Sequence, residues 1–272
     1  MMFNFLLVLG VIVLSLALRS FRQPIIHRIG TLGIFVCSFL AGWLFTQNIF
    51  IGCAFALSWL FLPWVEILTR IRALRLPVER TLTPRTPPSR NAFPGLQELT
   101  EEIEAEGFDY LADSGWEWDD HRQFFRLFYH TKEKLQASIC LVEQSELAFY
   151  YLIVSGRDAK GNVWMTWNYP FSYGLKLLPK LKINRANGDL HFVEILESQR
   201  NFLKAKGISE SALTEQTSEE IQADIQSDLR EQILHNIKIG LLKKESDNVI
   251  RYSVRGMFFL WFQFLRDLVR LS

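Results

Sequence analysis

The densest group of side chains that could do chemistry is the run Trp116-Glu117-Trp118-Asp119-Asp120-His121. Carboxylates and an imidazole this close together are ligand types that divalent metal ions accept. Neighbouring residues of one loop, however, do not converge on an ion as residues at i,i+2 or i,i+4 spacing do, and the sequence contains no second ligand cluster. We therefore predict an exposed loop before a strand, with no metal site and no catalytic role.

A second group combines aromatic and cationic side chains. The segment WMTWNYPFSYG, residues 164–174, is followed by spaced Lys and Arg residues. Aromatic rings beside cations could form a pocket for an anionic amphiphile or a surface that dips into lipid. The alternative is a strand end, a Tyr-Pro turn and a solvated basic edge. The pocket hypothesis rests on Trp164, Trp167, Tyr169, Lys176 and Lys180.

Known catalytic and cofactor-binding motifs are missing from the sequence. It contains no HExxH, GxSxG, GxGxxG or Gly-rich phosphate loop, and its His residues are scattered. The cysteines, Cys37, Cys53 and Cys140, form no CxxC pair and read as small buried residues. We expect no cofactor, and the sequence favours a protein that is not an enzyme without excluding one.

Charge is distributed unevenly along the chain. Residues 1–94 carry nine Arg and two Glu, residues 95–250 carry 17 basic and 26 acidic groups, and residues 251–272 carry four Arg and one Asp. Nucleic-acid binding needs clustered Lys and Arg on the folded part, which is the acidic part here. We therefore expect no nucleic-acid partner. The basic ends instead adjoin apolar segments, which is typical of membrane proteins.

The elements that hold these residues begin with an apolar block, residues 1–69. Residues 2–18 are uncharged, and the next uncharged stretch, 29–65, would be about 55 Å long as one helix, beyond a ~30 Å hydrocarbon core. The polar pair Gln47-Asn48 divides it, so we predict three transmembrane helices over about 2–18, 29–46 and 49–68. The first lacks the basic n-region of a cleaved signal peptide. Small residues such as Gly33, Cys37 and Gly52 would let the helices approach closely.

Arginine positions predict the orientation. Arg19, Arg22 and Arg28 lie between the first two spans, further Arg residues follow the third span, and the Gln47-Asn48 turn has no charge. Cytoplasmic loops carry the excess of Lys and Arg. The sequence therefore predicts a multi-pass membrane protein with its N-terminus outside and its main domain in the cytoplasm.

Residues 70–94 combine six Arg with five Pro, which predicts an extended, semi-rigid spacer that lies against anionic head groups. A cytoplasmic α+β domain follows over 95–250. Periodicity of two predicts an antiparallel β-meander over 123–130, 135–143, 147–155 and 162–168, with a candidate fifth strand at 180–185. Helices are predicted at 98–106, 189–206 and 218–243, packed on one face of the sheet.

The tail, residues 251–272, is predicted to be an amphipathic helix. Its polar residues share a narrow face and the rest is aromatic and aliphatic, which fits a helix lying in the head-group plane. The alternative is that the helix packs against the domain or the spans. The residues expected to contact anionic head groups of the bilayer are Arg255, Phe258, Trp261, Phe262, Arg266 and Arg270.

Two classes of function remain open. The first is a membrane-anchored, non-enzymatic scaffold, sensor or accessory subunit, with protein partners that the sequence does not identify. The second is an enzyme or lipid-binding module that acts on a lipid or envelope substrate at the bilayer face. The fold class common to both is a membrane-anchored α+β protein.

Overall fold

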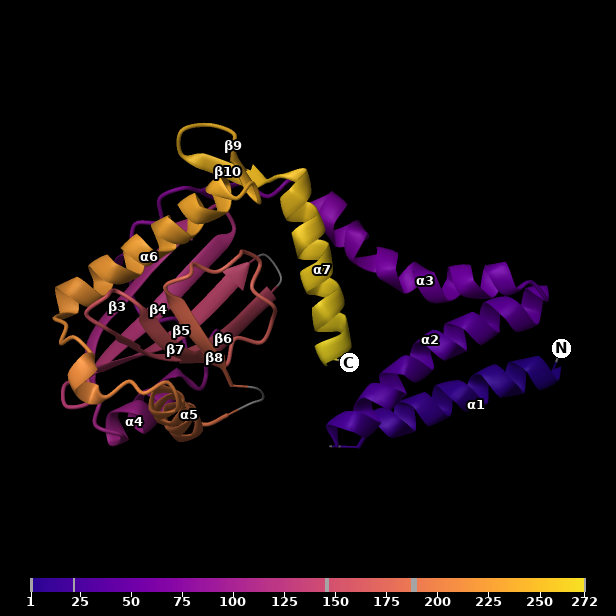
Figure 1. Ribbon diagram of the computed structural model, residues 1–272, viewed down its shortest axis with the longest axis horizontal. Coiled ribbons are helices and arrows are strands. Elements are labelled where there is room, and N and C mark those ends of the chain that lie inside the picture. Colours follow the sequence, from indigo (N-terminus) through magenta and orange to yellow (C-terminus); the bar gives the residue numbers. More distant parts are fainter. Residues whose placement is uncertain (1, 22, 145–146, 187–189, 272) are drawn as a thin grey trace. The chain divides into compact units, whose positions relative to one another are not determined.

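The computed structural model describes residues 2–271 except 22, 145–146 and 187–189, and the backbone but not the side chains of a few helical positions. The chain divides into two compact units (Figure 1). One unit comprises Met1–Leu74 together with Arg251–Ser272, and the other comprises Arg75–Ile250. The second unit is therefore inserted into the first.

Three long apolar helices begin the membrane unit: α1 (Met2–Arg19), α2 (Pro24–Thr46) and α3 (Ile49–Glu66). All three are long and apolar enough to cross a membrane. Asn48 begins α3 because its side chain accepts a hydrogen bond from the Phe50 amide at 2.9 Å. A short π-helix, η1 (Ile67–Ile71), follows α3. The three apolar helices predicted from the sequence are confirmed, and α2 begins five residues earlier than expected, at Pro24.

Small residues bring these helices together. A Cβ added to Gly52 would lie 2.9 Å from the Cβ of Trp43, and one added to Gly42 would lie 2.9 Å from the Cα of Gly52. Gly33 makes room for Ser15 of α1, whose hydroxyl donates to the Gly30 carbonyl. Both interfaces are therefore built by backbone close approach, which only glycine allows at these positions.

The tail forms a helix, α7 (Val254–Leu271), which packs on α3. The Trp261 indole N–H donates to the Leu60 carbonyl at 2.7 Å, in the turn of α3 that precedes Pro63. The ring of Trp64 meets Phe258 edge-on, with centroids 5.0 Å apart, and lies 6.5 Å from Trp261. A helix over the tail is thus confirmed, and part of its aromatic face contacts the third apolar helix, as in the alternative in which it packs against the spans.

The inserted domain begins and ends in one small sheet of order β1-β10-β9, with β1 (Leu76–Pro77), β9 (Leu242–Lys244) and β10 (Val249–Tyr252). β1 pairs antiparallel to β10, so that Leu76 lies opposite Ile250. An ion pair between Arg75 and Glu245 adds to this pairing. The segments where the chain enters and leaves the domain are therefore held side by side.

A seven-stranded sheet forms the body of the domain, in the order β2-β3-β4-β5-β6-β7-β8. Every neighbouring pair is antiparallel except β7 and β8, which are parallel. The strands are β2 (Thr83–Pro84), β3 (Asp109–Trp118), β4 (His121–His130), β5 (Leu135–Gln144), β6 (Leu147–Arg157), β7 (Val163–Trp167) and β8 (Leu181–Arg185). The meander is confirmed for β4 to β7, and the fifth predicted strand, 180–185, corresponds to β8.

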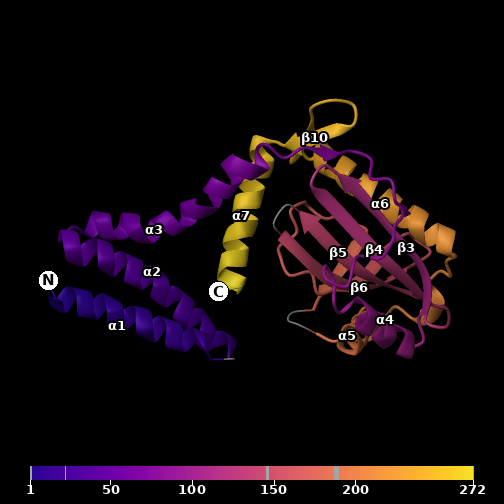
Figure 2. The same cartoon turned by 180° about the vertical axis from the view of Figure 1, so that it is seen from behind.

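Helices cover both faces of this sheet, which corrects the prediction that they share one face (Figure 2). On one face α4 (Leu96–Ala105) and α5 (Phe192–Ala205) bury residues such as Ile103, Phe128 and Leu196. On the other face Ile221 and Ile225 of α6 (Ser218–Lys238) pack with aromatic residues of the strands. In the central strands β4, β5 and β6, the side chains that face either side of the sheet are largely apolar, so both faces need to be covered by helices.

Residues 70–94, predicted to be a spacer, instead belong largely to the domain. They supply β1 and β2, and the side chains of Val78 and Phe93 are buried. The helix predicted to reach residue 243 ends at Lys238, because Gly240 adopts a left-handed φ of 77° and the chain turns into β9. A 3₁₀ turn, η2 (Glu210–Ala212), precedes α6.

Candidate functional site

The acidic run singled out from the sequence forms the β3–β4 hairpin rather than a loop before a strand. Trp116, Glu117 and Trp118 end β3, and Asp119 turns the chain with a φ of 53°. Glu117 is neutralised by Arg85 at 3.0 Å and by Arg122 at 3.1 Å. In the described part of the chain, no group of three His, Cys, Asp or Glu residues is placed to hold a metal ion.

His121 begins β4 beside this turn. Burial lowers the pKa of its imidazole, although Asp119 and Asp120 act in the opposite direction. A neutral imidazole with carboxylates that face water does not form an acid–base pair. In this hairpin Trp116 is buried, whereas the side chains of Asp119 and Asp120 are exposed.

The predicted aromatic and cationic pocket is divided between the two faces of the sheet. Trp164 packs toward α5, where its ring lies 5.9 Å from Phe202. Trp167 and Tyr169 belong to the opposite face, with ring centroids 5.5 Å apart, and both adjoin Tyr151. The structure brings Trp167 and Tyr169 together, but it places Trp164 elsewhere.

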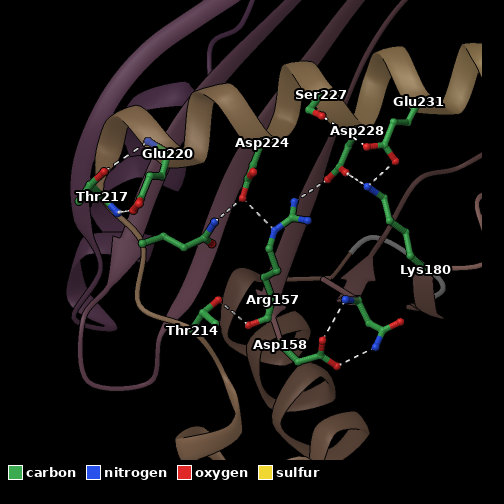
Figure 3. Close-up of polar contacts among 12 residues, drawn as sticks. Arg157, Asp158, Lys180, Thr214, Thr217, Glu220, Asp224, Ser227, Asp228 and Glu231 are labelled. Atoms are coloured by element: carbon green, nitrogen blue, oxygen red, sulfur yellow. Dashed lines mark hydrogen bonds and ion pairs between the residues drawn. The ribbon is translucent and has the colours of Figure 1, made fainter. Parts of the chain in front are cut away.

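The two lysines of that hypothesis are held by α6. Lys180 Nζ lies 2.7 Å from carboxylate oxygens of both Asp228 and Glu231 (Figure 3). Burial acts to lower the pKa of Lys180, but its hydrogen bonds to these carboxylates outweigh that effect and raise the pKa. Arg157 continues the network to Asp228 at 2.7 Å. The backbone amide of Lys176 donates to the Asn236 side chain.

Figure 3 shows Arg157, at the end of β6, and Lys180, just before β8, beside carboxylates of α6. Lys180 is already paired with two carboxylates, so it does not offer a free charge to an anionic ligand. These ion pairs instead hold α6 against its face of the sheet.

A cleft of about 510 Å³ lies elsewhere. It is formed where α4 and the start of α5 meet the C-terminal part of β5 and the N-terminal part of β6. Its floor includes Leu141 of β5 and Leu99 of α4. One wall is aromatic: the ring of buried Phe93 stacks on Tyr150 with centroids 4.7 Å apart, and Tyr150 remains 42% exposed. The cleft thus joins apolar surface to a partly exposed aromatic ring, the usual composition of a small-molecule site.

The charged groups of the cleft are acidic. Glu98 and Glu102 lie on the same side of α4, one turn apart, and both line the cleft. His191, the residue before α5, is 83% exposed, and its Nδ1 lies 3.8 Å from Glu102. Among the described residues that line the cleft there is no Lys, Arg, Ser, Thr or Cys. The lining therefore offers binding groups but no nucleophile of those types.

No pattern in the sequence indicates this cleft. Its walls come from residues 92–102, 141–150 and 190–191, and only the sheet register and the position of α4 bring them together. The apolar spacing of α4 predicted the helix but not the surface that it covers. Glu98 and Glu102 are ordinary surface acids in the sequence alone.

The comparisons with known proteins add no relative. A scan against protein-family models gives no match, and searches of curated proteins and of solved structures give no significant match.

Proposed function

We propose that this protein is a membrane-anchored, non-enzymatic binding domain that acts as a sensor or accessory subunit at the membrane. The observation that carries the proposal is the cleft, with its apolar floor, its aromatic wall and a pair of carboxylates. Such a site can recognise a ligand, whereas its described lining supplies no nucleophile with an adjacent base.

The way in which the domain joins the membrane unit supports this proposal. The segments that enter and leave the domain pair as β1 and β10, and α7 packs on α3 through Trp261 and Trp64. The domain is therefore joined to the other unit by two chain segments, which lie next to each other in the β1–β10 pair.

The test uses the full chain in lipid nanodiscs. A panel of small soluble metabolites of differing charge is screened by ligand-observed NMR against the wild type and Ala148→Trp, whose large ring would fill the cleft. Ala159→Trp, at an exposed turn, is the matched control. We expect ligands that bind the wild type and the control but not Ala148→Trp. Absence of any ligand, or equal binding by all three proteins, would reject the proposal, and chemical conversion of a ligand would favour the enzyme alternative.

The proposal includes an orientation, with the N-terminus outside and the domain in the cytoplasm, supported by the arginines around the first and third apolar helices. In a variant without native cysteines, Gln47→Cys should react with a membrane-impermeant thiol reagent in intact cells. Lys160→Cys, in an exposed turn of the domain, should react only after permeabilisation. The reverse pattern would invert the topology.

A second candidate, contact of the tail with anionic lipid, is favoured by the exposure of Arg255, Phe258, Phe262 and Arg266 on α7. The side chain of Arg270 lies outside the described residues. A fluorophore at Phe262→Cys in full-length protein should be quenched by brominated anionic lipids, and less so in high salt or in Arg255→Gln/Arg266→Gln. Quenching that is equal in zwitterionic lipid would exclude this recognition of head-group charge.

A further inference from the structure

We infer that the cleft between α4, the start of α5 and the adjacent ends of strands β5 and β6 takes a small organic cation joined to an apolar body. The inference rests on the proposed binding function and names the chemical class of its ligand. Three features of the cleft point the same way: its charge, its aromatic wall and its size.

Glu98 and Glu102 are negatively charged, and no Lys or Arg stands beside them among the described lining residues of the cleft. Glu98 forms no ion pair with any described residue, and Glu102 has only the exposed His191 imidazole near it, at 3.8 Å. Other carboxylates of the same domain, such as Glu117 and Glu133, are paired with arginine. In the cleft, acidic groups thus adjoin apolar surface, and the described lining residues include no Lys or Arg.

The aromatic wall adds a second means of recognising a cation. Phe93 supports one side of Tyr150 as a stacked pair, and the partly exposed Tyr150 ring lines the cleft. The negative face of a phenol ring attracts ammonium and guanidinium groups, and aromatic cages for quaternary ammonium ions use this attraction. An apolar body attached to the cation would cover Leu99 and Leu141 on the floor.

The remaining ligand classes fit less well. The first-turn amides of α4 favour an anion, but Glu98 occupies that same turn and offsets them. A neutral ligand of this size would desolvate the two carboxylates without pairing them. A bare metal ion lacks the three close ligands that it needs in the described chain. The volume of about 510 Å³ lies within the range of small-molecule sites.

The test compares three probes that share a benzene ring: benzyltrimethylammonium, benzyl alcohol and benzenesulfonate. Each is titrated into the full chain in zwitterionic nanodiscs by isothermal calorimetry. We expect the cation to bind most tightly and to bind roughly three- to tenfold more weakly to Glu98→Gln/Glu102→Gln, as for partly exposed charge pairs. Tyr150→Leu should weaken cation binding as well. Glu101→Gln, on the same helix but outside the cleft lining, is the matched control and should leave the affinity unchanged.

The outcomes separate this inference from the proposed function. Binding of the alcohol or the sulfonate that equals that of the cation, and that Ala148→Trp abolishes, would reject the cationic ligand and retain the cleft as a binding site. Cation binding that is unchanged in the double Gln variant, or equally reduced in Glu101→Gln, would also overturn the inference. Failure of all three probes, together with an empty metabolite screen, would reject both proposals.

Discussion

Replacement of Arg126 should destabilise the domain far more than replacement of another arginine that pairs with the same hairpin. Arg126 Nε and Nη2 donate to the two carboxylate oxygens of Asp113 at 2.8 and 2.7 Å, and Nη1 donates to Thr100 of α4 at 3.0 Å. The Arg126 and Asp113 side chains are only 11% and 7% exposed. Arg126→Met would keep most of the volume but leave the Asp113 carboxylate buried without a partner, at a cost of about 3–5 kcal/mol.

The matched control is Arg85→Met. Arg85 pairs with Glu117 across side chains that are 37% and 38% exposed, and such a pair contributes about 0–1 kcal/mol. Urea unfolding of the full chain in nanodiscs, followed by tryptophan fluorescence, measures both variants. With a slope of about 2 kcal/mol/M, Arg126→Met should lower the midpoint by roughly 1.5–2.5 M and Arg85→Met by less than about 0.5 M. Arg126→Met/Asp113→Leu should recover most of the loss. Equal midpoints for the two single variants would refute the assignment of Arg126 as a buried structural ion pair.

Three further predictions concern other parts of the chain. Gly52→Ala should destabilise the membrane unit by about 1–3 kcal/mol in a detergent-unfolding assay, because its Cβ would meet α2 at 2.9 Å, whereas Gly10→Ala, with nothing within 4 Å, should not. Burial raises the pKa of the Cys140 thiol, so in a Cys37→Ala/Cys53→Ala background a thiol reagent should label it only as the domain unfolds in urea, and labelling of the folded protein would contradict this. Arg200 lowers the pKa of Glu133, so their pair stabilises the domain above about pH 4.3 and is lost as the pH falls through the lower folded value. Arg200→Met should therefore lose less stability than the wild type between about pH 5 and 3, and parallel urea-midpoint profiles would exclude that role.

The apolar helices could be predicted from the sequence because a membrane span is a local property. Uninterrupted apolar runs bounded by Arg19 and by the Gln47-Asn48 pair define them without knowledge of tertiary contacts. The strands β4 to β6 were equally accessible, since their alternating residues are apolar and their turns are polar. α6 could be placed by its capping box, in which Thr217 and Glu220 bond each other's backbone amides.

The sequence did not predict the strand β3, because the β3 residues that face α4 are polar or glycine. Asp113, Gly115 and Glu117 stand at positions where an apolar residue would mark a strand. Asp113 is acceptable there only because Arg126, from the neighbouring strand, pairs with it. Gly115 is needed because an added Cβ would lie 2.4 Å from the Gln123 carbonyl oxygen. Both requirements come from residues of the neighbouring strand β4, so they produce no apolar alternation within β3 itself.

For a related reason, the sequence could predict neither the cleft nor the packing of α6 on the second face of the sheet. The apolar stripe of α6 showed that the helix is buried but not which face of the sheet receives it. Glu98 and Glu102 become part of a cleft only because the fold brings them together with Tyr150 of β6. Local sequence patterns therefore predict single elements well and the surfaces between distant elements poorly.

The insertion of the domain between α3 and α7 also sets the order in which the protein is made. Trp64 and the Leu60 carbonyl emerge early, but Trp261, which binds them, is translated only after the entire domain. At 5 to 20 residues per second the delay is roughly ten to forty seconds. During that interval the side of α3 that binds the tail is not yet covered by α7. The helix α7 can therefore pack on α3 only after the whole domain has been synthesised. A chain truncated within the domain would keep α1 to α3 but lack α7.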